Sequence, residues 1–111
     1  MGDQDYAECI EACHRCATAC DRCAAACLRE DDVKAMAGCV ALDMDCASLC
    51  RTAAGAMARE SEWAMPLCTL CAEACEACAE ECGRHPHDHC QQCAAACRAC
   101  AKACRSMSEQ Q

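Results

Sequence analysis

Cysteine, whose thiolate binds soft metal ions, recurs at helical spacing in three stretches of this 111-residue chain. Between Cys9 and Cys27, six cysteines alternate four and three residues apart, the spacing of one stripe along a helix. The same alternation returns in two later stretches. The three sets are Cys9, Cys13, Cys16, Cys20, Cys23 and Cys27; Cys68, Cys71, Cys75, Cys78 and Cys82; and Cys90, Cys93, Cys97, Cys100 and Cys104. The pattern predicts three helices that present thiols to a shared interior.

The spacing within each stripe favours Cu(I). Two thiols four residues apart, such as Cys46 and Cys50, lie one above the other on a helix, with about 5–6 Å between Cβ atoms. Such a pair can converge on a metal ion that accepts two ligands in line, or three with a bridging neighbour. Cu(I) is soft and prefers thiolate and thioether ligands. Successive pairs are joined by C-x2-C steps, so the sequence predicts a continuous ladder for many cuprous ions.

Charge favours a high copper-to-sulfur ratio. One Cu(I) held by two thiolates carries a net negative charge, and many such sites in one core would be costly to bury. Thiolates that bridge two copper ions bring the ratio toward one metal per sulfur, which is neutral. We therefore expect a capacity near the count of 19 cysteines.

Other roles for the cysteines stay open at this point. Zinc is the main rival metal, although it prefers closed groups of four ligands and the stripe is unbroken. Disulfides are common in short cysteine-rich chains, but the count is odd and the periodicity is helical. The sequence lacks the C-x2-C-x2-C-x3-C-P run that commonly binds an iron–sulfur cluster. No βαβ pattern surrounds a C-x2-C step, which disfavours a thioredoxin-like role.

Residues of other types are candidate accessory ligands. His85, His87 and His89 lie in the histidine-rich link R-H-P-H-D-H, either as metal ligands or as a polar turn. Asp43 is a hard oxygen donor on a sulfur stripe, and it either contacts copper or is satisfied by hydrogen bonds. Met36 is a candidate thioether ligand.

Four helices must position these residues. Leu, Ile, Val and Phe number only 8, too few for an ordinary core, so Cys and 26 Ala must fill it. The patterns predict helices over residues 5–29, 32–60, 66–82 and 89–106 of a single domain, residues 1–111. Short links favour an all-α, antiparallel up-down-up-down four-helix bundle with a cysteine-lined core. The second helix carries a degenerate stripe: Met36, Cys39, Asp43, Cys46, Cys50, Ala53 and Met57.

Local signals set the expected helix ends. The expected N-terminal caps are Asp5 with Glu8, Asp31 and Asp32, and Asp88 with Gln91. Pro66 is expected at the first position of the third helix, and Gly83 just past its end. The tail from Ser108 is expected to fray. One end of the bundle is then expected to be a polar mouth, formed by Met36, Cys39, Cys82, Cys90 and the histidine link. The other end is expected to be an apolar plug, formed by Tyr6, Met57, Trp63, Met65 and Met107.

Composition also bounds localisation and partners. The N-terminal residues show no export signal and no run is long enough to span a membrane, so a reduced, cytosolic protein is expected. A formal charge of −8 disfavours binding to nucleic acid.

The sequence resembles the copper storage proteins of bacteria, in particular their cytosolic branch. The likeness lies in the A-C-x2-C-x2-A-C-x2-C-A-x2-C runs, in Gly38 to Cys50, and in the link from Cys82 to Cys90. The resemblance implies a four-helix bundle filled with Cu(I), assembled as a homotetramer and located in the cytosol. It also implies that cysteines are the principal ligands, assisted near the open end by His85, His87 and His89 and by Asp43.

The sequence therefore predicts a non-enzymatic Cu(I) store that exchanges metal with a copper chaperone or a copper-requiring acceptor. The alternatives are metallothionein-like detoxification of zinc, cadmium or silver, and a redox protein that cycles dithiols.

Overall fold

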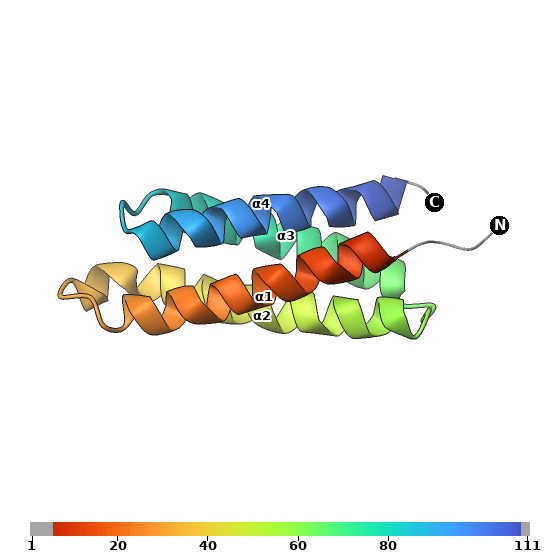
Figure 1. The fold of residues 1–111 in the computed structure, drawn as a ribbon, viewed down its shortest axis with the longest axis horizontal. Helices are drawn as coiled ribbons and strands as arrows, with labels where there is room; N and C mark the ends of the chain where they lie inside the picture. The colour runs from red at the N-terminus through yellow and green to blue at the C-terminus, as the bar shows by residue number, and fades with distance from the viewer. Residues whose placement is uncertain (1–5, 110–111) are drawn as a thin grey trace.

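Small side chains on the inward faces let four helices pack closely along their whole length. The computed structural model describes residues 6–109, and it consists there of α1 (Ala7–Cys27), a short 3₁₀ helix η1 (Val33–Met36), α2 (Ala37–Ala58), α3 (Ala64–Gly83) and α4 (Asp88–Glu109). Each helix packs against the helices before and after it, and α4 closes the ring against α1 (Figure 1). The predicted all-α antiparallel bundle is confirmed.

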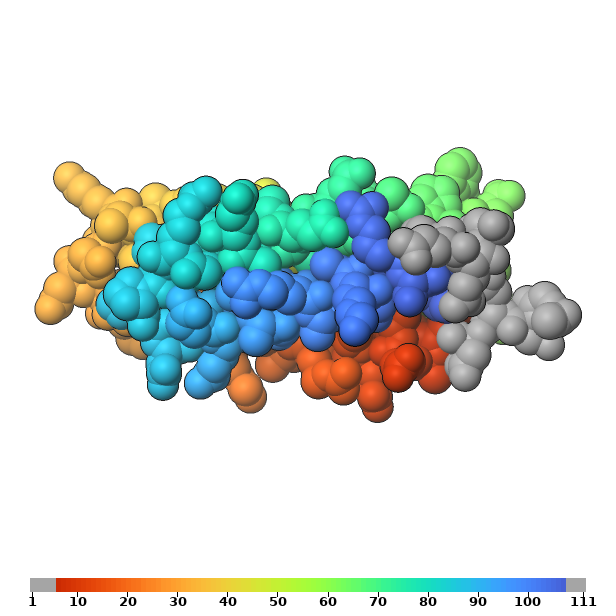
Figure 2. All heavy atoms as spheres, turned by 90° about the horizontal axis from the view of Figure 1, so that it is seen from above, coloured from red at the N-terminus to blue at the C-terminus, as the bar shows by residue number. Residues whose placement is uncertain are grey.

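The bundle is a rod of 52 × 19 × 17 Å. Figure 2 shows α3 and α4 lying along each other on one face of this rod, with the link between them at one end. The links α1–α2 and α3–α4 share that end, called the mouth below (residues 28–36 and 84–87). No helix in the described part of the chain is long and apolar enough to cross a bilayer.

The second helix begins later than predicted. Residues 33–36 form a 3₁₀ turn, closed by a bond from the Ala35 N–H to the Asp32 carbonyl at 2.9 Å, and α2 starts at Ala37. Asp32 makes no side-chain cap hydrogen bond, so its predicted capping role is wrong. The tighter turn brings the chain back over the mouth and buries Met36 completely. The predicted Asp5–Glu8 cap involves Asp5, which lies outside the described residues.

The second helix also ends through an unexpected residue. The Ser61 N–H bonds to the Ala56 carbonyl at 2.9 Å, and the Glu60 N–H bonds to the Met57 carbonyl at 3.0 Å. These two bonds form a Schellman motif, with Glu60 at the left-handed position at a φ of 54°. α2 therefore stops at Ala58 instead of residue 60.

The ends of α3 differ by one or two residues from the prediction. α3 starts at Ala64, which places Pro66 third in the first turn, where an N–H has no helical partner in any case. Gly83 is the last helical residue, and Arg84 follows it with a right-handed backbone at a φ of −78°. The prediction that Gly83 lies just past the end of the helix is therefore wrong.

The start and end of α4 also differ. Asp88 is its first helical residue, and the Gln91 amide donates to the carbonyls of Gly83 and His85 at 3.1 and 2.7 Å, so the predicted capping box is absent. The helix runs to Glu109, so Ser108 and Glu109 are not frayed, while Gln110 and Gln111 lie outside the described residues.

The apolar plug at the end opposite the mouth is mostly as expected. Met57 and Met107 are buried there, and Tyr6 and Met65 pack partly buried against the core. Trp63 is 63% exposed, which contradicts its predicted place in the plug, because it precedes the first turn of α3.

Candidate metal centre

The thiols fill the whole axis of the bundle. All 19 cysteines are free and buried. α1 contributes six, α2 three, and α3 and α4 five each, because the alternation of three and four residues keeps every one on the inward stripe. Sulfur, with alanine between the rungs, thus occupies the place of an aliphatic core.

One series of close sulfur contacts runs from the plug toward the middle of the bundle. Its first steps join Cys9 to Cys104 at 3.7 Å, and Cys13 to Cys104 and Cys100 at 4.0 and 3.7 Å. Further steps of 3.5–3.9 Å continue the series. We call this series the terminal segment; it contains Cys9, Cys13, Cys16, Cys20, Cys46, Cys50, Cys71, Cys75, Cys93, Cys97, Cys100 and Cys104. Cys68, near the start of α3, is buried at the same end.

Neighbouring groups of four thiols share members. Cys16 and Cys46 belong to one group with Cys20 and Cys97, and to a second with Cys50 and Cys75. In each group the four sulfur atoms lie within 4.8 Å of one another. Shared thiols suit ions joined by bridging thiolates, whereas a structural zinc site uses its own closed set of four.

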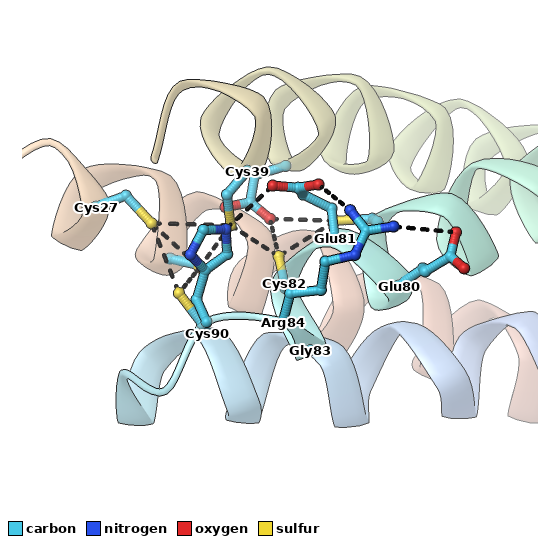
Figure 3. A network of polar contacts seen from close by, with 12 residues as sticks. Cys27, Cys39, Glu80, Glu81, Cys82, Gly83, Arg84 and Cys90 are labelled. Atoms are coloured by element: carbon cyan, nitrogen blue, oxygen red, sulfur yellow. Dashed lines mark hydrogen bonds and ion pairs between the residues drawn. The ribbon is translucent and has the colours of Figure 1, made fainter. Parts of the chain in front are cut away.

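A second series, the mouth segment, connects Cys23, Cys27, Cys39, Cys78, Cys82 and Cys90. Figure 3 shows Cys27, Cys39, Cys82 and Cys90 pointing toward one another from four helices. The Cys39 and Cys82 sulfur atoms lie 2.9 Å apart, and Cys27 lies 3.9 Å from Cys39 and 3.8 Å from Cys90. The mouth therefore ends in a compact cluster of thiols.

Asp43 joins the two segments. Its Oδ1 atom accepts hydrogen bonds from Cys93 of the terminal segment at 3.2 Å, and from Cys78 and Cys82 of the mouth segment at 3.2 and 3.4 Å. Asp43 is 0% exposed, and it is the only residue of a charged type that is buried in the described part of the chain. Asp43 is thus satisfied by hydrogen bonds in the absence of metal, and any contact with copper stays a prediction.

The three link histidines have different surroundings. The Nδ1 atom of His89 lies 3.6 Å from the sulfur atoms of Cys23 and Cys90 and 3.9 Å from that of Cys27. Its Nε2 atom lies 2.8 Å from the Glu30 carboxylate. A carboxylate on the outer nitrogen is the arrangement that orients a metal-binding histidine, so the geometry suits His89 beside Cys23, Cys27 and Cys90, and its role as a ligand stays a prediction.

The other two histidines stay outside the thiol cluster. His85 pairs with Glu81 at 3.0 Å, beside the Arg84–Glu81 pair drawn in Figure 3. His87 stacks on the His89 ring, with centroids 5.4 Å apart, and lies 3.5 Å from Glu30. Their role as metal ligands stays a prediction. The role of Glu30 was not predicted from the sequence. The available signal was an acidic residue that follows a cysteine-rich helix, at the same end of the bundle as the histidines.

Comparisons with known proteins agree with this geometry. Residues 2–109 match the profile of the family described as copper storage protein. The chain belongs to the copper storage protein family. It is 49% identical over 106 residues to the cysteine-rich protein YhjQ of Bacillus subtilis. This alignment covers 95% of this chain and 98% of that protein.

Solved structures of other copper storage proteins superpose closely. The Cu(I)-bound copper storage protein BsCsp3 is 48% identical, with a TM-score of 0.91 over 95% of this chain and 99% of that one. A cytosolic copper storage protein from Streptomyces lividans, in a structure on copper loading with five coppers, is 42% identical. Its TM-score is 0.90 over 93% of this chain and 91% of that one.

Burial raises the pKa of several acidic groups in the interior of this family member. Burial raises the pKa of the Asp43 carboxyl to about 7. Burial, aided by the neighbouring Cys27, raises the pKa of the Cys90 thiol to about 11, and burial likewise raises that of Cys39. A thiol must lose its proton to bind metal as a thiolate, so the metal competes with protons at these positions.

Proposed function

We propose that this chain is a cytosolic Cu(I) store, which holds many cuprous ions on thiolates inside the bundle and performs no catalysis. The observation that carries the proposal is the ladder itself: all 19 cysteines are free and buried, and several of them, such as Cys16 and Cys46, belong to two overlapping groups of four. Overlapping sites suit a soft ion that tolerates shared ligands. The Cu(I)-bound relative at 48% identity supports cuprous storage over a metallothionein-like role with zinc, cadmium or silver.

The proposal includes a capacity of about one copper per cysteine. Bridging keeps the loaded core near neutrality, whereas two thiolates per ion would bury a negative charge at every site. Titration of the reduced apo-protein with Cu(I) against a chromophoric cuprous chelator tests this. Saturation near 19 equivalents is expected for the 19 cysteines, and saturation at about half of that count would contradict shared thiolates.

A variant pair sharpens the titration. Cys16→Ala with Cys46→Ala removes two thiols that belong to two overlapping groups, so the capacity is expected to fall. Ala17→Ser with Ala47→Ser is the matched control, because it perturbs buried neighbours on the same helices and removes no ligand. A control variant that folds, by circular dichroism, and still loses as much copper would contradict the assignment.

We also propose a homotetramer, the cytosol as the compartment, and exchange of copper with a chaperone or an acceptor protein. The Streptomyces lividans relative is cytosolic by name, which supports the compartment. Sedimentation velocity of the apo- and copper-loaded protein tests the assembly. A single monomeric species in both states would contradict it.

A further inference from the structure

One cysteine of the ladder lines a surface groove, and it is not at the mouth. All 19 cysteines lie within the described residues; Cys9 is 3% exposed and each of the others is 0% exposed. At the mouth, the thiols of Cys23, Cys27 and Cys90 lie behind the His89 ring. Cys9 is at the opposite end, in the first turn of α1.

A groove of about 550 Å³ between α1 and α4 opens onto Cys9. Ala12 and Met107, both buried, and the half-buried Ala103 give it an apolar base. Two exposed cations, Arg15 and Lys102, line its outer part. Its volume lies within the usual range for a small-molecule site, about 300–1,000 Å³.

The charge in the groove favours an anionic ligand. Arg15 pairs with Glu11 at 3.3 Å, but both side chains are largely exposed, so water screens this pair and it competes weakly with a ligand carboxylate. Glu8 is the acidic residue that lines the groove, against the two cations. A small molecule with two carboxylates and one sulfur atom would place its charges at the cations and its sulfur toward Cys9.

We propose that this groove binds an anionic low-molecular-weight thiol, which takes Cu(I) from Cys9 at the terminal end of the ladder. The transfer half of this proposal rests on the proposed copper storage. The incoming thiol forms a new Cu–S bond while the Cu–S bond of Cys9 breaks, and its proton passes to the Cys9 sulfur. Copper stays cuprous throughout, so no oxidant or reductant is needed. Cys104, 3.7 Å from Cys9, is the next thiol in line to refill the position.

The occupant is small for steric reasons. A nearly buried sulfur admits a slender thiol, whereas a metal site on the surface of another protein would need Cys9 to protrude. Transfer to a protein carrier alone is therefore an outcome that would overturn the proposal.

The first test measures binding without copper. S-methylglutathione, a probe that carries two carboxylates and a blocked sulfur, is titrated into apo-protein while backbone amide NMR signals are followed. Shifts are expected at residues lining the groove, such as Ala99 and Ala103. Arg15→Gln with Lys102→Gln is expected to weaken binding about fivefold to tenfold, as loss of two exposed charge contacts implies. Lys34→Gln with Arg51→Gln removes the same charge elsewhere and is expected to change nothing. No shifts, or equal weakening by both double variants, would overturn the proposal.

The second test follows copper leaving the loaded protein. Glutathione is expected to remove copper about fivefold to tenfold more slowly from the Arg15→Gln/Lys102→Gln variant, whereas neutral 2-mercaptoethanol removes it at the wild-type rate. Ala103→Trp, which fills the groove, is expected to slow both thiols. Equal rates of glutathione removal in all variants would overturn the proposal. If those rates are equal but the protein still binds its full complement of copper, the transfer proposal fails and the storage proposal stands. If the protein does not bind many copper ions but the probe binds in the first test, the storage proposal fails and the binding site stands.

Discussion

The Oδ1 atom of Asp43 lies 3.2 Å from the Sγ atom of Cys93, so a carboxyl group on α2 and a thiol on α4 share a hydrogen bond across the bundle interior. The same oxygen accepts from Cys78 on α3, also at 3.2 Å. Polar groups from three helices therefore meet at one buried point, between the terminal and mouth segments. This point ties folding of the apo-protein to the protonation of one acid.

The free energy of unfolding of the apo-protein is expected to fall with rising pH because of Asp43. Burial raises its folded-state pKa from 3.8 to about 7, so the stability given by the neutral acid is complete below pH 3.8 and is lost as pH rises through about 7. At about 1.4 kcal/mol per unit, the loss approaches about 4 kcal/mol. Asp43→Asn should flatten this part of the curve.

Chemical denaturation of reduced apo-protein at several pH values between 4 and 8 measures this effect. Asp45→Asn, an exposed acid on the same helix, is the matched control and should retain the wild-type slope. Parallel curves for wild type and Asp43→Asn would refute the assignment of the buried proton to Asp43.

Removal of His89 is expected to slow copper loading more than removal of His85. His89 is the link histidine whose ring nitrogen contacts three mouth thiols, whereas His85 pairs with Glu81. Loss of one supporting ligand typically costs about 10- to 100-fold in metal affinity or activity. Stopped-flow transfer of Cu(I) from a chromophoric donor to His89→Ala and His85→Ala measures the difference. His14→Ala, an exposed histidine on α1, is the control, and equal slowing by all three would argue against a specific role for His89.

Glu60→Gly is expected to stabilise the protein. Glu60 holds a left-handed backbone, with φ of 54°, at the C-terminal cap of α2. A side chain in that conformation costs about 1–2 kcal/mol, which glycine avoids. Thermal unfolding should show a higher midpoint for Glu60→Gly, while Glu62→Gly, two residues on, has no left-handed conformation to relieve and should not gain. A lower midpoint for Glu60→Gly would mean that the Glu60 side chain stabilises the cap by another route.

Sequence periodicity predicted the fold well because it marks the inward face of each helix directly. The alternating cysteines identified the buried stripes of α1, α3 and α4, and Asp43 was correctly placed on the weaker stripe of α2. Helix ends were predicted less well. Glutamate does not signal a left-handed cap, yet Glu60 forms one. Glycine does signal such a cap, yet Gly83 lies inside a helix.

The site required tertiary structure in two respects. Nothing in the spacing says which of three alternate histidines faces the thiols; the start of α4 at Asp88 decides it, because it puts His89 in the first turn beside Cys90. Likewise, the contacts of Asp43 come from α3 and α4, which are distant in sequence. The exposure of Cys9 depends on how closely α1 and α4 approach, which periodicity does not report.

Proton release should distinguish shared thiolates from isolated pairs. Since burial raises the pKa of thiols such as Cys90 (to about 11) and Cys39, these thiols are protonated at neutral pH and must release protons as they bind metal. If every thiolate bridges, about one proton leaves per Cu(I); if two thiolates serve each ion alone, about two leave. Cu(I) supplied as its acetonitrile complex to weakly buffered apo-protein, with a pH indicator, gives this ratio directly. A ratio near one is expected through saturation, and a ratio that stays near two would contradict a bridged core even if the total copper bound were high.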